Sequence, residues 1–149
     1  MGRALRKLAG AEIDRLEATR GFFSSPLIRT RETIERARVA MGLSQHGYRL
    51  SDGLKELTFG DWEGLTWPEV QARDPAGAAA RARDKWDFTP PNGESYAALA
   101  QRIAPWVEAI DRDLFVASHG GVAPAVAAEN SIHQGRALLF AEGGFRWIG

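Results

Sequence analysis

Cysteine is absent from this chain of 149 residues, and histidine occurs only three times. Without cysteine there is no disulfide, no thiolate metal site and no cysteine nucleophile. No apolar run approaches the roughly 20 residues that a membrane span needs, and the amino terminus lacks the apolar stretch of a secretion signal. These absences predict a cytoplasmic protein that does not associate with a membrane.

An excess of charge of one sign is also lacking, because 19 lysines and arginines offset 19 acidic residues. No global field draws nucleic acid or an anionic membrane to such a chain, so any recognition of an anion must be local. Apolar residues make up 44% of the sequence, which is enough for one sizeable core. The length predicts a single domain over residues 1–149 and no nucleic-acid partner.

The stretch 114–122 gives the strongest local signal. Leu114–Ala117 is an unbroken apolar run, typical of a strand buried on both faces of a parallel sheet, and a helix is expected over 122–128. This order places His119 at the carboxyl edge of a sheet, where open α/β folds bind ligands. Gly120 and Gly121 let backbone N–H groups approach an anion closely. The alternative is a histidine that only packs at a strand end.

A second anion-binding feature is predicted near residue 26. The sequence favours a helix over 26–41 with Ser25 as its N-cap, and Arg29 falls in the first turn. A cation does not stabilise that end of a helix, because the helix dipole is positive there. A helix N-terminus combined with an arginine instead suits an anion. The alternative is an exposed arginine that pairs with Glu32 or Glu35.

The other expected elements alternate between strand and helix, which predicts an α/β fold with a largely parallel sheet. The segment 74–84 is rich in alanine and arginine and suits either a surface helix or a lid. The remaining expectations are helices over 3–19, 67–73 and 96–110, a short strand at 21–23, a loop at 89–93 and two strands between 138 and 148.

Four blocks, in this order, resemble the signatures of the histidine phosphatase superfamily, also called phosphoglycerate mutase-like. They are Ser24–Thr33, Leu54–Gly64, Pro91–Ser95 and Ser118–Gly121. The resemblance implies a three-layer α/β/α sandwich around a mostly parallel sheet. It also implies hydrolysis of small phosphomonoesters through a phosphohistidine intermediate. The compact chain favours a phosphatase over a mutase.

The resemblance also assigns site residues. Arg29 and His119, with the backbone at Gly120, match the phosphate pocket, and His119 would steady the transferring group. Cationic donors suit this task because negative charge lies on the equatorial phosphoryl oxygens. Glu56 matches the proton donor to the leaving alcohol, which a carboxyl group can be if burial or phosphate raises its pKa. Without the family resemblance, the sequence favours the alternative that Glu56 is a surface glutamate at a strand end.

Glu94 and Ser95 are weaker candidates for substrate contact, since an N-capping role already explains Ser95. The resemblance implies no metal and no organic cofactor. The expected partner is a small phosphorylated molecule or inorganic phosphate, with specificity set by the segment 72–91.

The family's nucleophile is a histidine in an Arg-His-Gly motif on the first strand, and this sequence has no such motif. His119 is already assigned, His133 lies in a late loop, and His46 in Gln45-His46-Gly47 follows no buried strand. The chain is therefore expected to lack its nucleophile and first strand, to be N-terminally incomplete, and to be inactive as given. Whether it is an enzyme stays open on this evidence.

The resembling fold has its first strand inside the sheet, so its absence would leave unpaired ladder groups at about 1–3 kcal/mol each. Three repairs are expected: an upstream start in the natural protein, pairing with a second copy, or closure by the remaining strands. We favour an upstream start and a homodimer or strand-exchanged oligomer. The alternative function is a non-catalytic phosphate-binding or interaction module, and a third is a structural domain without a ligand.

Overall fold

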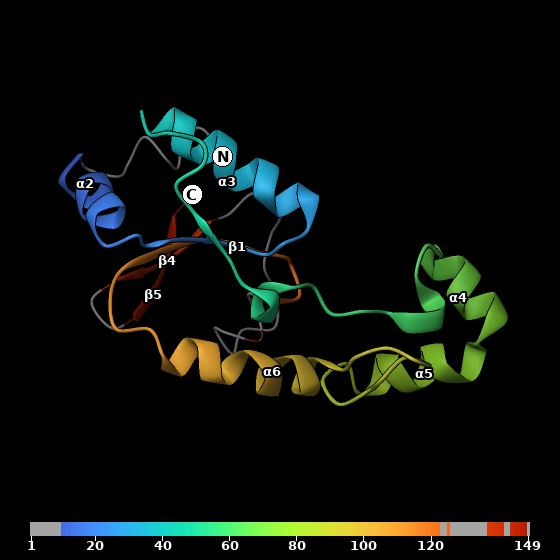
Figure 1. Ribbon diagram of the computed structural model, residues 1–149. Helices are drawn as coiled ribbons and strands as arrows, with labels where there is room; N and C mark the ends of the chain where they lie inside the picture. Colours follow the sequence, from blue (N-terminus) through green and yellow to red (C-terminus); the bar gives the residue numbers. More distant parts are fainter. Residues whose placement is uncertain (1–9, 123–124, 126–136, 142–143, 149) are drawn as a thin grey trace.

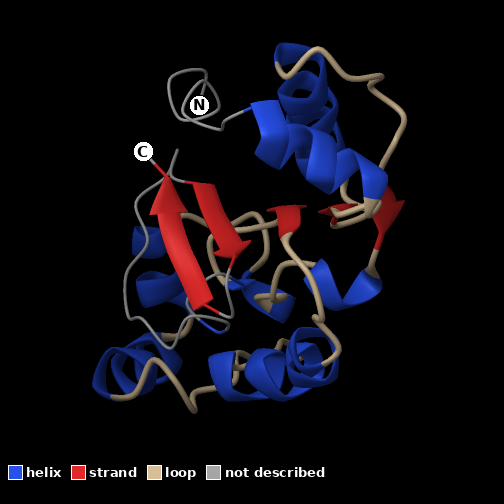
Figure 2. Cartoon of the chain, turned by 90° about the vertical axis from the view of Figure 1, so that its left-hand side faces the viewer, coloured by secondary structure: helices blue, strands red, loops and turns tan. Residues whose placement is uncertain are grey.

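The computed structural model describes residues 10–122, 125, 137–141 and 144–148, and it places helices on both faces of one sheet (Figure 1). The order of the strands in the sheet is β2-β1-β3-β4-β5. The first three are parallel, whereas β4 runs antiparallel to β3 and β5 antiparallel to β4. Figure 2 shows β4 and β5 side by side. The strands are β1 (Phe22–Ser24), β2 (Arg49–Leu50), β3 (Leu114–Ala117), β4 (Ala137–Ala141) and β5 (Gly144–Ile148).

The two central strands end level with each other. In β1 and β3, Phe22 pairs with Phe115 and Ser24 with Ala117. The N–H of Ser25 donates to the carbonyl of Ala117 at 3.0 Å, which extends the ladder by one bond. Because carboxyl ends of parallel strands meet at one edge, the residues that follow β1 and β3 are neighbours in space.

The helices form the outer layers of the sandwich. In Figure 1, α2 and α3 lie on one face of the sheet, α6 lies on the other, and α4 and α5 extend beyond one end. This arrangement confirms the predicted α/β/α architecture. The helices are α2 (Gly10–Ala18), α3 (Ile28–Ala40), α4 (Trp67–Arg73), α5 (Pro75–Arg83) and α6 (Tyr96–Glu108).

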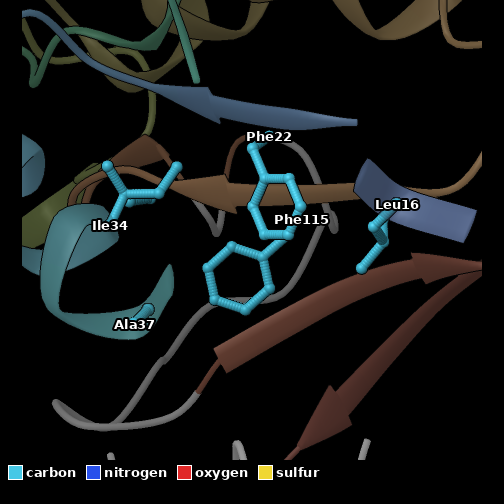
Figure 3. Close-up of a cluster of buried hydrophobic side chains, with 6 residues drawn as sticks. Leu16, Phe22, Ile34, Ala37 and Phe115 are labelled. Carbon is cyan, nitrogen blue, oxygen red and sulfur yellow. The ribbon is translucent and has the colours of Figure 1, made fainter. Parts of the chain in front are cut away.

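Alternating side chains of the central strands fill two cores. Phe22 and Phe115 face α2 and α3, with ring centroids 5.7 Å apart, in the cluster shown in Figure 3. Phe23 and Val116 pack on the opposite side against the cluster centred on α6. The period of two in each strand thus joins both helical layers to one sheet. The cluster of Figure 3 comprises Leu16, Phe22, Ile34, Ala37, Phe115 and Ala117, and that of α6 comprises Leu54, Leu57, Leu99, Ile103 and Val122.

Arg38 of α3 is fully buried beside the first core. Its guanidinium donates to both carboxylate oxygens of Glu17 in α2, at 2.8 and 3.1 Å, and to the carbonyl of Ser44 at 2.7 Å. It also lies 4.4 Å from the ring centroid of Phe22. A buried cation needs such partners, so this cluster ties α2 to α3.

Local sequence signals are confirmed at two helices, α4 and α6, and a third segment, 74–84, is helical where the sequence left a surface helix or a lid open. α4 carries the expected capping box, in which Thr66 and Glu69 satisfy each other's backbone N–H groups. Ser95 caps α6, where its hydroxyl accepts from the N–H of Ala98 at 3.1 Å. The segment 74–84 forms helix α5, capped by Asp74.

The start of α3 differs from the prediction. The expected helix over 26–41 begins at Ile28, so its N-cap is Leu27 and Ser25 is not the cap. This happens because Ser25 still belongs to the extended chain that pairs with β3. Residues 3–9 of the first expected helix, and most of the helix expected over 122–128, lie outside the described residues.

Within this chain β3 has partners on both sides. It pairs with β1 and, at Leu114 and Phe115, with Phe140 and Leu139 of β4. β3 thus has a hydrogen-bonded neighbour strand on each side among the described strands. Among the described residues, no helix is long and apolar enough to cross a membrane.

Candidate functional site

Arg29 and His119 meet at the carboxyl edge of β1 and β3. The Nε–H of Arg29 donates to Nδ1 of His119 at 3.1 Å. Because Nδ1 accepts, the ring proton lies on Nε2, which is 2.8 Å from the hydroxyl oxygen of Ser25 and donates to it. Ser25 and His119 are both buried. Two elements distant in sequence thus fix one imidazole tautomer beside one guanidinium.

The surroundings of His119 favour its neutral form. Burial lowers its pKa from 6.5 to about 4, and the positive charge of Arg29 acts in the same direction. The imidazole is therefore neutral at physiological pH when the site holds no anion. An anion beside Arg29 would oppose both effects, because it favours the imidazolium.

His119 should make stability depend on pH. Its pKa is lower in the folded chain, so the unfolded chain takes up the proton first as the pH falls. The free energy of unfolding should therefore decrease between about pH 6.5 and pH 4, through this residue. Urea unfolding at pH 7 and pH 5 should show a smaller decrease in His119→Asn than in the parent chain. The exposed His46 provides the control, and an unchanged decrease in His119→Asn would contradict this origin.

The N-terminus of α3 is open toward the same edge. Its N-cap, Leu27, makes no side-chain capping bond, and the first turn contains no acidic residue. Arg29 is exposed in that turn, and apart from its bond to His119 its side chain has no bonding partner among the described residues. The hydroxyl of Thr30 instead donates to the carbonyls of Ser25 and Leu27. The helix thus presents N–H groups and a cation without an anion of its own.

Glu56 reaches the glycine turn that follows His119. Both oxygens of its carboxylate accept from the N–H of Gly121 at 3.1 Å, and Oε1 also accepts from the N–H of Leu57. A Cβ atom at Gly121 would overlap the carboxylate, so glycine permits this approach. The space beside Gly120 is open, which leaves its backbone accessible. A cation, an imidazole and a carboxylate therefore share one rim of the sheet.

Arg102 of α6 bonds to the loop that precedes Glu56 in the sequence. Its guanidinium has five N–H donors and makes five bonds: two to the carboxylate of Glu94, at 2.8 and 2.9 Å, and three to carbonyls of Asp52, Gly53 and Lys55. These contacts connect the loop to α6 just before the site carboxylate.

Two further predicted site residues, Glu94 and Ser95, make contacts that stabilise the fold. Glu94 pairs with Arg102, and Ser95 caps α6. The structure brings Arg29, His119 and Glu56 to one rim, while a substrate contact by Glu94 or Ser95 stays a prediction.

Replacing Arg102 with glutamine should loosen the loop that carries Glu56. We expect a loss of about 2 kcal/mol in the free energy of unfolding, because Glu94 loses its partner and three carbonyls lose donors. Amide exchange at Leu57 and Gly121, whose N–H groups bond to Glu56, should become faster. Arg102→Lys can keep the ion pair but not the full set of carbonyl bonds, so its exchange should be intermediate.

The control for this prediction is Arg112→Gln, which removes an exposed arginine that pairs with its neighbour Asp111. Its exchange rates at Leu57 and Gly121 should equal those of the parent chain. Equal protection of these two amides in Arg102→Gln would show that the loop does not depend on this side chain.

Three of the contacts that shape the site do not follow from the sequence. The sequence predicts Ser25 as a helix cap, although its hydroxyl bonds to His119. Ser118 donates to the carbonyl of Leu54 at 2.9 Å and so joins β3 to the loop of Glu56. Arg102, in the middle of a helix, gives no signal. Ser118 directly precedes His119 and Ser25 lies four residues before Arg29, so both serines fall within the sequence blocks that resemble the family, and this feature could have marked them.

Of the two remaining histidines, only His46 lies in the described part of the chain, and it does not join the site. His46 is exposed after α3, where its Nε2 lies 2.8 Å from the side-chain amide of Gln45, and His133 lies outside the described residues. In the part of the chain that the structure describes, no three His, Asp or Glu side chains gather as a metal would require.

Comparison with known proteins gives one family. The model of the histidine phosphatase superfamily (branch 1) matches residues 1–137. A 6-phosphofructo-2-kinase/fructose-2,6-bisphosphatase of Caenorhabditis elegans is 38% identical over 77 residues, which are 50% of this chain and 17% of that protein. The chain therefore spans only a small part of this curated relative.

Solved structures show the same fold. TTHB049 from Thermus thermophilus is 29% identical, with a TM-score of 0.60, and the match covers 89% of this chain and 77% of that one. The mycobacterial glucosyl-3-phosphoglycerate phosphatase Rv2419c, in complex with inorganic phosphate, is 23% identical, with a TM-score of 0.68. That match covers 98% of this chain and 81% of the other.

Proposed function

The chain belongs to the histidine phosphatase superfamily, and from this premise we propose that it binds the phosphoryl group of a small phosphomonoester, or inorganic phosphate, between Arg29 and His119. The observation that carries the proposal is the contact of these two side chains at the open N-terminus of α3. Guanidinium, imidazole and helix N–H groups are donors that suit the three equatorial oxygens of a phosphoryl group.

Phosphate entry changes the bonding of His119. The Nη groups of Arg29 are free of described protein partners and can donate to two phosphoryl oxygens. The dianion raises the pKa of His119, so that Nδ1 gains a proton and turns from acceptor of the Arg29 bond into a donor. The site then offers a cation pair to the anion, and binding takes up a proton.

Glu56 supplies the carboxyl group on the same rim. In the family's reaction the histidine nitrogen forms a bond to phosphorus, the ester P–O bond breaks, and a carboxyl group protonates the departing alcohol. Water then cleaves the N–P bond and releases phosphate. Glu56 fits the donor role because Arg102 and Ser118 hold carbonyls of the loop just before it, while its carboxylate stays beside the glycine turn.

We further propose that this 149-residue chain does not complete that reaction by itself. His119 is engaged in the pocket, His46 is exposed on a loop, and no described residue supplies a second imidazole beside Arg29. Without a nucleophile the covalent route is closed, and phosphate binding is the activity that remains.

The test is a titration of the chain with inorganic phosphate, the ligand in the complex of the mycobacterial phosphatase of the same fold. We expect saturable heat of binding and a rise in Tm with phosphate concentration. An aryl phosphate should be hydrolysed at the background rate, and no acid-labile phosphoenzyme should form. An unchanged Tm and no heat would contradict the phosphate site.

A separate result would contradict the proposal that this chain does not complete the reaction by itself. An acid-labile phosphoenzyme that disappears in His46→Ala or in His133→Ala would show that the chain does carry a nucleophile.

A permanent phosphate-binding module is the second candidate function, since Arg29 and His119 are retained. Joining a strand that bears Arg-His-Gly ahead of residue 1 separates the two: turnover supports the phosphatase, and binding without turnover supports the module.

The outer strand β2 supports a proposal about the oligomeric state. Leu50 of this strand is about half exposed, and β2 pairs only with β1 among the described strands. An uncovered edge can pair with a second copy. We propose a homodimer, for which light scattering should give twice the mass of one chain, whereas a single-chain mass would contradict it.

A further inference from the structure

The imidazole of His119 lies between a cation and a hydroxyl. Among the described residues its ring bonds to Arg29 through Nδ1 and to Ser25 through Nε2. An arginine guanidinium can only donate, so Nδ1 accepts and the proton of the neutral ring lies on Nε2. Ser25 is therefore the far end of a chain of bonds that reaches the cation of the phosphate site.

The hydroxyl oxygen of Ser25 has a second donor. The N–H of Leu27 also donates to it, at 3.3 Å. A hydroxyl oxygen has two lone pairs, so these two N–H groups use its full accepting capacity. The side chain of Ser25 is thus placed to accept from the ring and not to donate to it.

The main chain of Ser25 holds this hydroxyl in place. Its N–H donates to the carbonyl of Ala117 at 3.0 Å. Its carbonyl accepts from the hydroxyls of Ser24 and Thr30, at 2.9 and 3.0 Å. Ser25 is fully buried, so bulk water has no access to the hydroxyl. A group fixed in this way can orient its partner at little further loss of entropy.

The bond to Ser25 suits both charge states of His119. Nε2 carries a proton in the neutral ring and in the imidazolium, so it donates to Ser25 in either state. Nδ1 instead accepts from Arg29 in the neutral ring and becomes a donor when it gains a proton. The other neutral tautomer, with its proton on Nδ1, would set two N–H donors against each other.

The charged groups near the ring come from two elements. Arg29 of α3 bonds to Nδ1, and its charge lowers the pKa of His119. Glu56, in the segment between β2 and α4, bonds to the N–H of Gly121, two residues beyond His119. Ser25 carries no charge, so its replacement changes the orientation of the ring and leaves the charge of the site as it was.

We propose that Ser25 is a positioning residue of the phosphate site. Its hydroxyl accepts from Nε2 of His119 and holds the ring with Nδ1 toward Arg29, so that an entering anion meets both side chains already oriented. Ser25 acts through the imidazole and makes no contact with the anion. The inference rests on the proposed phosphate site, to which it adds the residue that sets the tautomer.

The nitrogen resonances of His119 test this role without a ligand. At pH 7, long-range 1H–15N NMR spectra of the parent chain should show a protonated Nε2 and a bare Nδ1. In Ser25→Ala the ring loses its acceptor, so both tautomers become populated and the two nitrogen shifts should move toward each other. Ser24→Ala is the matched control, because it removes a buried hydroxyl that bonds to the carbonyl of Ser25. The exposed His46 serves as the internal reference.

Titration with inorganic phosphate gives the effect on binding. Ser25→Ala should bind phosphate about tenfold more weakly than the parent chain, because the anion must first reorient the ring. Ser24→Ala should keep the parent affinity. In a His119→Gln background, Ser25→Ala should cause no further loss, since the two residues act as one unit. A further tenfold loss in that background would show that Ser25 acts on the anion directly.

Three other results overturn the proposal: a parent chain with the proton on Nδ1, parent-like shifts or affinity in Ser25→Ala, or an equal loss in Ser24→Ala. Near-ultraviolet circular dichroism shows whether the variants are folded, and the parent spectrum decides the tautomer even if Ser25→Ala does not fold. A parent chain that binds no phosphate contradicts the phosphate site itself. Phosphate binding that is unchanged in Ser25→Ala contradicts only the role of Ser25.

Discussion

Replacing Arg29 with glutamine is expected to weaken the binding of inorganic phosphate about 100-fold, which corresponds to about 2.7 kcal/mol. The change removes a cation whose outer N–H groups bond to no other described residue, and charge-assisted bonds to phosphate are among the strongest polar contacts. Isothermal titration calorimetry at pH 7 and low ionic strength measures the effect. The affinity of the parent chain should fall with added salt, and the variant should show less of this dependence.

Arg31→Gln is the matched control for this experiment. Arg31 lies two residues further along the same helix and is exposed, with its Nε 3.4 Å from the hydroxyl of Tyr48. It carries the same charge but lies outside the contact with His119. A loss in Arg31→Gln as large as in Arg29→Gln would indicate a diffuse attraction by the helix and would contradict a defined site.

Replacing Glu17 with glutamine should lower the free energy of unfolding by about 2 kcal/mol, less than for a fully buried ion pair because the Glu17 side chain is 42% exposed. Arg38 is fully buried and gives Glu17 two of its donors, so the neutral variant leaves a guanidinium without its counter-charge inside the protein. A buried ion that loses its partner is far more costly than a surface one. Urea unfolding followed by tryptophan fluorescence gives the change from the shift in the midpoint.

Glu32→Gln is the control, because it makes the same change of side chain in a solvent-exposed ion pair. Glu32 pairs with Arg36 on the exposed face of α3 at 3.7 Å, and both side chains are more than half exposed. We expect no measurable change in stability for this variant. If Glu17→Gln also left the free energy of unfolding unchanged, the bond to the carbonyl of Ser44 and the contact with the ring of Phe22 would be sufficient to hold Arg38.

Much of the fold follows from short-range signals in the sequence. The apolar run Leu114–Ala117 predicts β3, and Thr66 with Glu69 predicts the start of α4, because each signal acts within a few residues. β2 was not predictable in this way. It consists of Arg49 and Leu50, both exposed, and it is a strand only because β1 lies beside it.

The positions of the candidate site residues were predictable where the backbone geometry requires particular residue types. Glycines after a buried strand and an arginine in a first helical turn indicate His119 and Arg29, and the family motifs add Glu56. What the sequence could not show is the set of partners that orients them. Ser25 and Arg102 contribute through distant pairs, and such pairs have no periodicity that a single sequence displays.

Ser25 and His119 are 94 positions apart, and they become neighbours only when β1 pairs with β3. The β4–β5 hairpin is by contrast a local pairing, with Ala141 opposite Gly144. Closing a long loop loses more chain entropy than closing a short one, so distant pairings slow the folding of a chain. We therefore expect the hairpin to form early and the imidazole–hydroxyl contact late. A refolding chain would then gain the ability to hold an anion only when its two halves have come together.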